Sequence, residues 1–202
     1  MLNIMDRFEP KASPNNSRYV PLTQQPSCCV PTCIQMVMYK EGIPLVPAEE
    51  IGYHMGLVVL PEKGELFFKP HTAEEAPPTG YGIQKMPDAA FEALGIPLTC
   101  NVRPIKEFST PAELLSELMK IEASNGNALL CFNYGGLIGD CLKDWGHNCV
   151  FDRVIDGQIR MIDPSPQQPK WRMVPVVKMF NGMKRRGVKI AAGIWILERK
   201  RS

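Results

Sequence analysis

Three cysteines, Cys28, Cys29 and Cys33, fall within six residues near the start of the chain. A thiol becomes a strong nucleophile when it ionises, and a helix N-terminus or a neighbouring imidazole favours the ionised form. Cys29 stands just before a segment with helical spacing of apolar residues, and Pro31 suits the first turn of such a helix. The positive end of the helix dipole would stabilise a thiolate there. Cys29 is therefore the candidate nucleophile.

Thiol catalysis also needs a base, a group that orients the base, and donors facing the oxyanion. His147 lies in a Gly-His-Asn-Cys-Val stretch at the head of a predicted strand and is the candidate base. Asp163 follows sixteen residues later, at the end of the next predicted strand, and is the candidate orienting group. Gln24 and Gln25 lie just before Cys29, and either carboxamide could donate to an oxyanion together with the Cys29 backbone N–H.

These motifs resemble those of the papain-like cysteine peptidases. The matching features are a glutamine, Cys-x-Pro-Thr-Cys at a helix start, Gly-His opening a strand, and Asp-Pro sixteen residues on. The most similar branch is the bacteriocin-leader (double-glycine) peptidases and their relatives, and the match is best over residues 20–40 and 145–165. The resemblance implies a papain-like fold with Cys29 as nucleophile, His147 as base, Asp163 as orienting group and a glutamine as oxyanion donor.

The chain departs from the family pattern at two places. Val30 follows the nucleophile where the family usually has glycine. The family glutamine stands about six residues before the cysteine, a place that Thr23 occupies here. The choice between Gln24 and Gln25 therefore stays open, with Gln24 weakly favoured. Cys28 is the alternative nucleophile, although choosing it would break the Cys-x-Pro-Thr-Cys match.

Sheet geometry gives a test that is independent of the family. A two-residue turn at 156–157 would pair Val150 with Asp163 and place Asp163 on the face opposite His147, because side chains alternate with period two. A three-residue turn at 155–157 moves the pairing by one residue and puts both side chains on one face. Glycine at the end of that turn suits the left-handed position of a three-residue loop. The sequence therefore predicts the three-residue turn.

Periodicity and punctuation predict an α+β fold, with helices first and mostly consecutive antiparallel strands after them. The expected order is N-terminal helices, with the nucleophile at a helix start, packed on an antiparallel sheet that carries the histidine and the aspartate. Residues 58–88 are expected to be irregular and Gly135–Gly139 to be a flexible connection, and both could shape a substrate cleft. Residues 1–20 are expected to form an extended arm and residues 21–202 a single domain. Helices are predicted at 31–39, 47–56, 88–94, 110–123 and 174–184, and strands at 98–102, 128–134, 148–155, 158–162 and 188–197.

Composition excludes several classes of protein. The 202 residues are 45% hydrophobic and 22% charged, which is typical of a globular chain. The start lacks the apolar core of a signal peptide and no stretch is long enough to span a membrane, so a cytoplasmic protein is expected. Residues 170–202 hold ten basic residues and one acidic residue, read here as a solvated surface; no nucleic-acid partner and no cofactor are expected.

Other interpretations of the same residues remain. The cysteine cluster could hold a metal with His147 or Cys149, but its spacing is not a usual zinc pattern. Buried inert thiols are the ordinary role of Cys100, Cys131 and Cys33. A second enzyme class, the phytochelatin synthases, shares the Gln–Cys–His–Asp order and implies transfer of γ-glutamylcysteine. A catalytically inactive papain-like binding or regulatory module is the alternative from outside the enzymes. The favoured function is a thiol-dependent amide hydrolase acting on a peptide or peptide-like amide.

Overall fold

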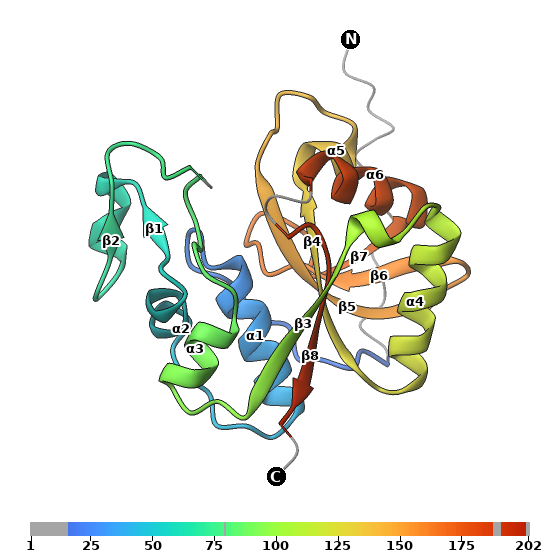
Figure 1. Cartoon of the computed structure of the whole chain (residues 1–202), viewed down its shortest axis with the longest axis horizontal. Coiled ribbons are helices and arrows are strands. Elements are labelled where there is room, and N and C mark those ends of the chain that lie inside the picture. The colour runs from blue at the N-terminus through green and yellow to red at the C-terminus, as the bar shows by residue number, and fades with distance from the viewer. Residues whose placement is uncertain (1–15, 79, 188–190, 201–202) are drawn as a thin grey trace.

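The computed structural model describes residues 16–78, 80–187 and 191–200. Its main sheet has six antiparallel strands in the order β3-β8-β4-β5-β6-β7, with helices on both faces (Figure 1), so the α+β expectation is confirmed. The strands are β3 (Leu98–Pro104), β8 (Gly193–Arg199), β4 (Asn127–Asn133), β5 (Gly146–Ile155), β6 (Gln158–Ile162) and β7 (Trp171–Pro175).

Strand β4 lies near the middle of the sheet and is buried along its whole length. Its residues alternate between two core clusters. Leu129 and Cys131 join the cluster on the α1 side, whereas Ala128, Leu130 and Phe132 join the cluster beneath the later helices. A continuous apolar run is the pattern expected of a strand that is covered on both faces.

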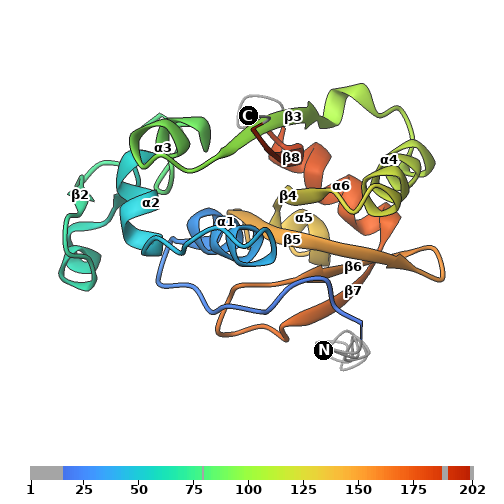
Figure 2. The same ribbon diagram turned by 90° about the horizontal axis from the view of Figure 1, so that it is seen from below.

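The N-terminal half of the chain covers the first face (Figures 1 and 2). Helix α1 packs directly against β5, and the shorter α2 and α3 lie beyond it. The segment 58–88 is largely irregular, as expected, and contains only short regular pieces. The elements of this half are α1 (Cys29–Lys40), α2 (Ala48–His54), β1 (Val58–Val59), the 3-10 helix η2 (Pro61–Leu66), β2 (His71–Thr72) and α3 (Asp88–Ala93).

Helices α4 and α6 cover the second face, and α5 joins β4 to β5 through a loop. Helix α4 begins as its sequence predicts: the Thr110 hydroxyl accepts from the Glu113 N–H at 3.2 Å, and the Glu113 carboxylate accepts from the Ser109 N–H at 2.8 Å. The elements of this face are η3 (Ile105–Glu107), α4 (Pro111–Ala123), α5 (Tyr134–Ile138) and α6 (Val176–Arg186).

The expected flexible connection at Gly135–Gly139 is instead the helix α5. Asn133 caps it, with the side-chain oxygen accepting from the Gly136 N–H at 2.7 Å, and Gly139 ends it in a left-handed conformation at φ 76°. A Cβ at Gly136 would crowd the backbone of Gly182 in α6. The glycines therefore serve close helix packing, because they let α5 approach α6.

Two boundaries at the C-terminal end also differ from the prediction. Val174 and Pro175 belong to the strand β7, and α6 starts only at Val176. Strand β8 begins at Gly193, and residues 188–190 of the predicted strand lie outside the described residues.

The turn between β5 and β6 corrects the predicted three-residue loop. Ile155 pairs with Gln158, so Asp156 and Gly157 form a two-residue turn, with φ values of 50° and 74°. Such values suit the hairpin turn whose twist matches the flanking strands. The register then shifts by one between residues 151 and 153, which makes Asp152 the extra residue of a β-bulge.

The bulge has the effect that was expected of the longer turn. It restores the pairing of Val150 with Ile162, so that Asp163 follows on the face of His147. The sequence prediction therefore placed His147 and Asp163 on the same face correctly, but it assigned this to a three-residue turn instead of a bulge. The bulge shifts the phase of the alternation, since Phe151 and Val154, three residues apart, pack in the same core cluster, and a single such shift is easily missed in a sequence.

The last part of the expected N-terminal arm packs against the sheet, whereas residues 1–15 lie outside the described residues. Tyr19 is buried, and its hydroxyl donates to the Asn127 side-chain oxygen at 3.0 Å. The neighbouring Arg18 reaches the backbone carbonyls of Phe151 and Asp152 in β5.

Candidate active site

Cys29 lies at a helix start, as predicted, although α1 begins at Cys29 itself and thus two residues earlier than expected. The first helical hydrogen bond runs from the Thr32 N–H to the Cys28 carbonyl at 3.0 Å, so the thiol lies at the end where backbone N–H groups are unsatisfied. Burial alone would raise the pKa of Cys29. Hydrogen bonding to His147, the His147 charge and backbone donors outweigh burial and lower the pKa below its ordinary value.

His147 is buried at the head of β5, with the rings of Phe132 and Tyr134 edge-on to its imidazole. Its Nε2 lies 2.8 Å from Asp163 Oδ1, and the ring also interacts with the thiols of Cys149 and Cys29. Burial opposes protonation of the imidazole, but the surrounding Cys149, Asp163 and Cys29 raise the pKa of His147 well above its usual value.

Asp163 is fully buried directly after β6, and every acceptor contact it makes favours the ionised carboxylate. Oδ1 accepts from His147 and from the Ser165 N–H at 2.9 Å, and Oδ2 accepts from Arg172 Nη1 at 3.0 Å. Burial would raise the pKa of Asp163, but the hydrogen bond and charge of His147, the Ser165 donor and Arg172 lower it.

Arg172 is a site residue that the sequence reading missed. It is buried in β7 and lies over the ring of Tyr134 as well as against Asp163. A lone arginine in a basic C-terminal region gave no reason to choose it. In a strand, Arg172 lies on the same face as the buried Val174 two residues later. If residues 171–175 had been predicted as a strand, this pattern would have indicated an inward-facing arginine.

The structure separates the two candidate glutamines. Gln24 is half-buried, its backbone N–H donates to the Pro164 carbonyl at 2.9 Å, and its side-chain Oε1 is buried without a hydrogen-bond partner in the described part of the chain. Gln25 is exposed, and its carbonyl accepts from the Cys28 N–H at 3.0 Å. Gln24 is thus fixed beside the turn that carries Asp163, whereas Gln25 faces outward.

The absence of a side chain at Gly146, next to His147, leaves space that the Arg186 side chain occupies. A methyl group at this position would overlap the guanidinium of Arg186, which reaches over from the end of α6. Trp145 before it is 49% exposed and stacks on Tyr134, with ring centroids 5.3 Å apart. The His147 segment is therefore held by aromatic and guanidinium contacts from α5 and α6.

The thiols of Cys28, Cys149 and Cys33 are buried and poor nucleophiles. Cys28 is fully buried against Leu57 and Val59, and burial raises its pKa to about 12. Burial likewise raises the pKa of Cys149 to about 12. Cys33 is buried, and its thiol donates to the Asn148 carbonyl at 3.5 Å.

Among the described residues, one group of side chains in this region could act as metal ligands. The ligand atoms of His147, Cys149 and Asp163 lie within 4.8 Å of one another. His147 and Asp163 are at hydrogen-bond distance, however, and the Arg172 guanidinium already neutralises Asp163. The donor set therefore fits an imidazole–carboxylate pair better than a cation site.

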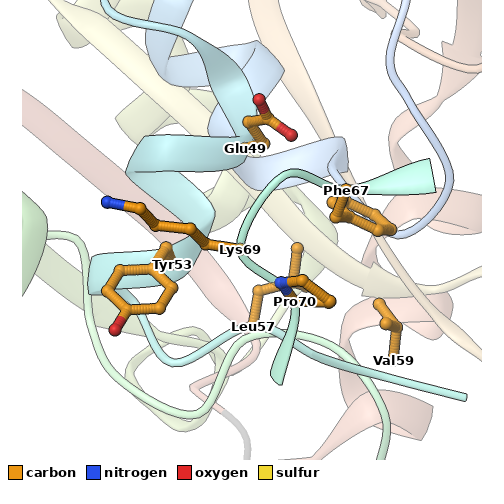
Figure 3. Close-up of a pocket in the computed structure, with 7 residues that line it drawn as sticks. All are labelled: Glu49, Tyr53, Leu57, Val59, Phe67, Lys69 and Pro70. Atoms are coloured by element: carbon orange, nitrogen blue, oxygen red, sulfur yellow. The ribbon is translucent and has the colours of Figure 1, made fainter. Parts of the chain in front are cut away.

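Two cavities lie among α1, α2 and the segments that flank these helices. A cavity of about 290 Å³ adjoins the loop that leads to Cys29, and Thr23, Gln25, Gln35, Pro47, Ala48 and Glu49 line it. A smaller pocket between α2 and the segment after β1 is lined by Glu49, Tyr53, Leu57, Val59, Phe67, Lys69 and Pro70 (Figure 3). Its lining contains no candidate site residue.

No helix in the described ranges combines the length and apolar character needed to cross a membrane.

Comparison with known proteins identifies the fold. No protein-family model matches the chain, and no curated protein matches its sequence. Among solved structures, a Bacillus anthracis protein provisionally described as a C39-like peptidase superposes with a TM-score of 0.54. The match covers 90% of this chain and 96% of the other at 16% sequence identity. With a cysteine at a helix start and the His147–Asp163 pair beside it, the chain has the papain-like fold of a C39-like peptidase structure.

Proposed function

We propose that the protein is a thiol-dependent amide hydrolase that acts on a peptide or peptide-like substrate. One observation carries this proposal: the His147 imidazole lies 2.8 Å from the buried carboxylate of Asp163, and its interaction with the thiol at the start of α1 lowers the pKa of Cys29. This is the nucleophile–base–orienter arrangement that activates a thiol. The C39-like fold of the structural neighbour supports the same chemistry.

The proposed reaction starts with the Cys29 thiolate attacking the substrate carbonyl carbon. The Gln24 carboxamide and the Cys29 backbone N–H would donate to the oxyanion that forms. His147, as imidazolium, then gives its proton to the leaving amine and a thioester remains. Water, deprotonated by His147, hydrolyses the thioester and regenerates the thiol. Asp163 fixes the tautomer and stabilises the imidazolium throughout.

The substrate is proposed to lie across the N-terminus of α1. The cavity lined by Gln25, Gln35 and Glu49, together with Pro47 and Ala48, adjoins this position and offers both polar and apolar groups. All seven cysteines are free thiols, which is compatible with a reducing compartment such as the cytoplasm.

Acyl transfer is the second candidate for the same site. Its supporting observation is the order of Trp171 and Val174-Pro175 in β7 followed directly by α6, the arrangement in which the sequence resembles phytochelatin synthases. In that reaction an amine of a second thiol-peptide, rather than water, would attack the thioester.

A peptidyl epoxysuccinate and a library of peptide amides test the proposal. Covalent labelling at Cys29 and library cleavage, both lost in Cys29→Ala and retained in Cys28→Ala, are the expected results. Adding glutathione separates the two reactions, since transfer yields a longer thiol-peptide and hydrolysis a free acid. Labelling of Cys28, or none in the folded protein, would overturn the proposal.

A further inference from the structure

Asp152 stands five residues from His147 and touches no substrate-facing group, yet it decides which side of the sheet Asp163 occupies. The two-residue turn at 156–157 would by itself pair Val150 with Asp163. Because Asp152 bulges out of the ladder, Val150 pairs with Ile162 instead. If Asp152 were instead paired within the ladder, His147 and Asp163 would point to opposite faces.

We propose that Asp152, clamped by Arg18 and Arg160, is a positioning residue that holds the register of the His147–Asp163 pair. The inference rests on the proposed function, because it assigns a role in assembling that site. It adds that the segment before the nucleophile loop contributes to catalysis through Arg18.

The clamp closes on both sides of the bulge. The Asp152 carboxylate is fully buried; Oδ2 accepts from Arg160 Nε at 2.6 Å and Oδ1 from the Arg18 backbone N–H at 2.8 Å. The Arg18 guanidinium donates to the Asp152 carbonyl, to the Phe151 carbonyl at 3.1 Å and to the Gly126 carbonyl at 2.9 Å. Carbonyls at the site of the register shift thus receive donors from Arg18.

Chemistry explains why these residue types are required. A bulge leaves backbone groups without ladder partners, and buried unpaired groups are costly. A guanidinium carries several donors in a fixed fork and can reach neighbouring carbonyls at once. Arg160 lies in β6, three residues before Asp163, and its positive charge pairs with the Asp152 carboxylate. Its Nη2 donates to the Asn16 carbonyl at 3.1 Å. The bulge is therefore favoured over the slipped register only while the clamp is present.

Two changes at Asp152 have opposite expected effects. Asp152→Ala keeps the extra residue but removes the clamp, so the ladder can take up position 152 and shift Asp163 to the wrong face. Deleting Asp152 removes the extra residue itself, so Val150 still pairs with Ile162 and Asp163 stays on the face of His147. Combining the deletion with Arg160→Met avoids leaving a buried unpaired cation.

The experiment measures two properties in each folded variant: the proton NMR signal of the His147 Nε2–H, and the pH dependence of Cys29 alkylation by iodoacetamide. In Arg18→Ala and Asp152→Ala we expect loss of the downfield Nε2–H signal and at least tenfold slower Cys29 alkylation at pH 6. We expect partial recovery in Arg18→Lys and near-wild-type values in the deletion combined with Arg160→Met. Phe91→Leu, a core change in α3, controls for general destabilisation.

The outcomes separate the two proposals. A wild-type protein with neither the signal nor selective Cys29 alkylation would overturn the proposed function. A wild-type protein with both, together with clamp variants that keep both, would overturn the positioning role. Loss in the deletion variant equal to that in Asp152→Ala would also overturn it, because the buried ion pair would then matter only for stability.

Discussion

At the scale of single residues, the candidate site is an arrangement of charged and hydrogen-bonding groups that lowers the pKa of the Cys29 thiol. His147 and backbone donors lower the pKa of Cys29. One carboxylate oxygen of Asp163 contacts the imidazole, and its other oxygen accepts from Arg172. Cys149, with Asp163 and Cys29, is among the groups that raise the pKa of His147, while burial raises the pKa of the Cys149 thiol itself to about 12.

Arg172→Met tests the missed member of the site. Removing one partner of a buried ion pair typically costs about 3–5 kcal/mol of unfolding free energy, because the other charge is left uncompensated. We expect a cost of that order in urea denaturation, and a higher pKa of Asp163, seen as a shift of the acidic limb of Cys29 alkylation to higher pH. Unchanged stability and an unchanged acidic limb would show that Arg172 does not support Asp163.

The two glutamines give a matched pair of variants. Loss of one oxyanion donor costs roughly 10²–10³-fold in kcat. We expect Gln24→Ala to lose activity on that order and exposed Gln25→Ala to stay within about twofold, measured by cleavage of a substrate from the peptide library. The reverse ranking would move the oxyanion donor to Gln25.

The raised pKa of His147 predicts how stability varies with pH. A histidine whose folded pKa is raised stabilises the protein fully below its unfolded pKa of about 6.5, and this stabilisation fades as pH rises through the folded pKa. In a Cys29→Ala background, which removes the coupled thiol, the difference in unfolding free energy between His147 and His147→Gln should be largest below pH 6.5 and shrink above it. A difference that grows with pH would contradict the pKa assignment.

At the scale of elements, the site is made by one helix start and one β-hairpin. Helix α1 brings the thiol, and β5, β6 and the residue after β6 bring the imidazole and the carboxylate. The segment of Gly146 depends on contact with another element, because the Arg186 side chain from α6 occupies the space where a side chain at 146 would stand.

Gly146→Ala tests this contact. Overpacking of a close contact usually costs about 1–3 kcal/mol, and the displaced Arg186 lies next to the segment that carries His147. We expect lower stability in thermal unfolding and slower Cys29 alkylation. The double variant with Arg186→Ala should recover the alkylation rate, and failure to recover would mean that Gly146 is needed for another reason.

The sequence predicted local features of these elements well and tertiary ones poorly. The start of α1, the capped start of α4 and the strands β5 and β6 follow from proline, capping residues and alternation. The Asp152 bulge and α5 were missed, because the bulge is contacted by an arginine far away in the sequence and the glycines of α5 allow close packing on α6. Cys29, His147 and Asp163 were chosen as candidates from motif and spacing, whereas Arg172 would have been noticed only if residues 171–175 had been predicted as a strand.

At the scale of the whole molecule, the candidate site residues are distributed between two halves that meet along α1 and β5. The N-terminal half carries the thiol and the C-terminal half carries the imidazole, the carboxylate and its arginine (Figure 1). The excess of basic residues after residue 170 is only partly a solvated surface. Arg172 neutralises Asp163 and Arg186 packs on Gly146, so some of that charge belongs to the site.

The most direct measurement of the central claim is the pH-dependent rate of iodoacetamide labelling at each cysteine, read by mass spectrometry, in wild type and His147→Ala. The lowered pKa of Cys29 predicts selective labelling of Cys29 below pH 7, lost in the variant, while the buried Cys28 and Cys149 stay unreactive. Uniform labelling of the accessible thiols, with the pH dependence of a free cysteine near a pKa of about 8.5, would contradict the thiolate–imidazolium pair and with it the proposed enzyme.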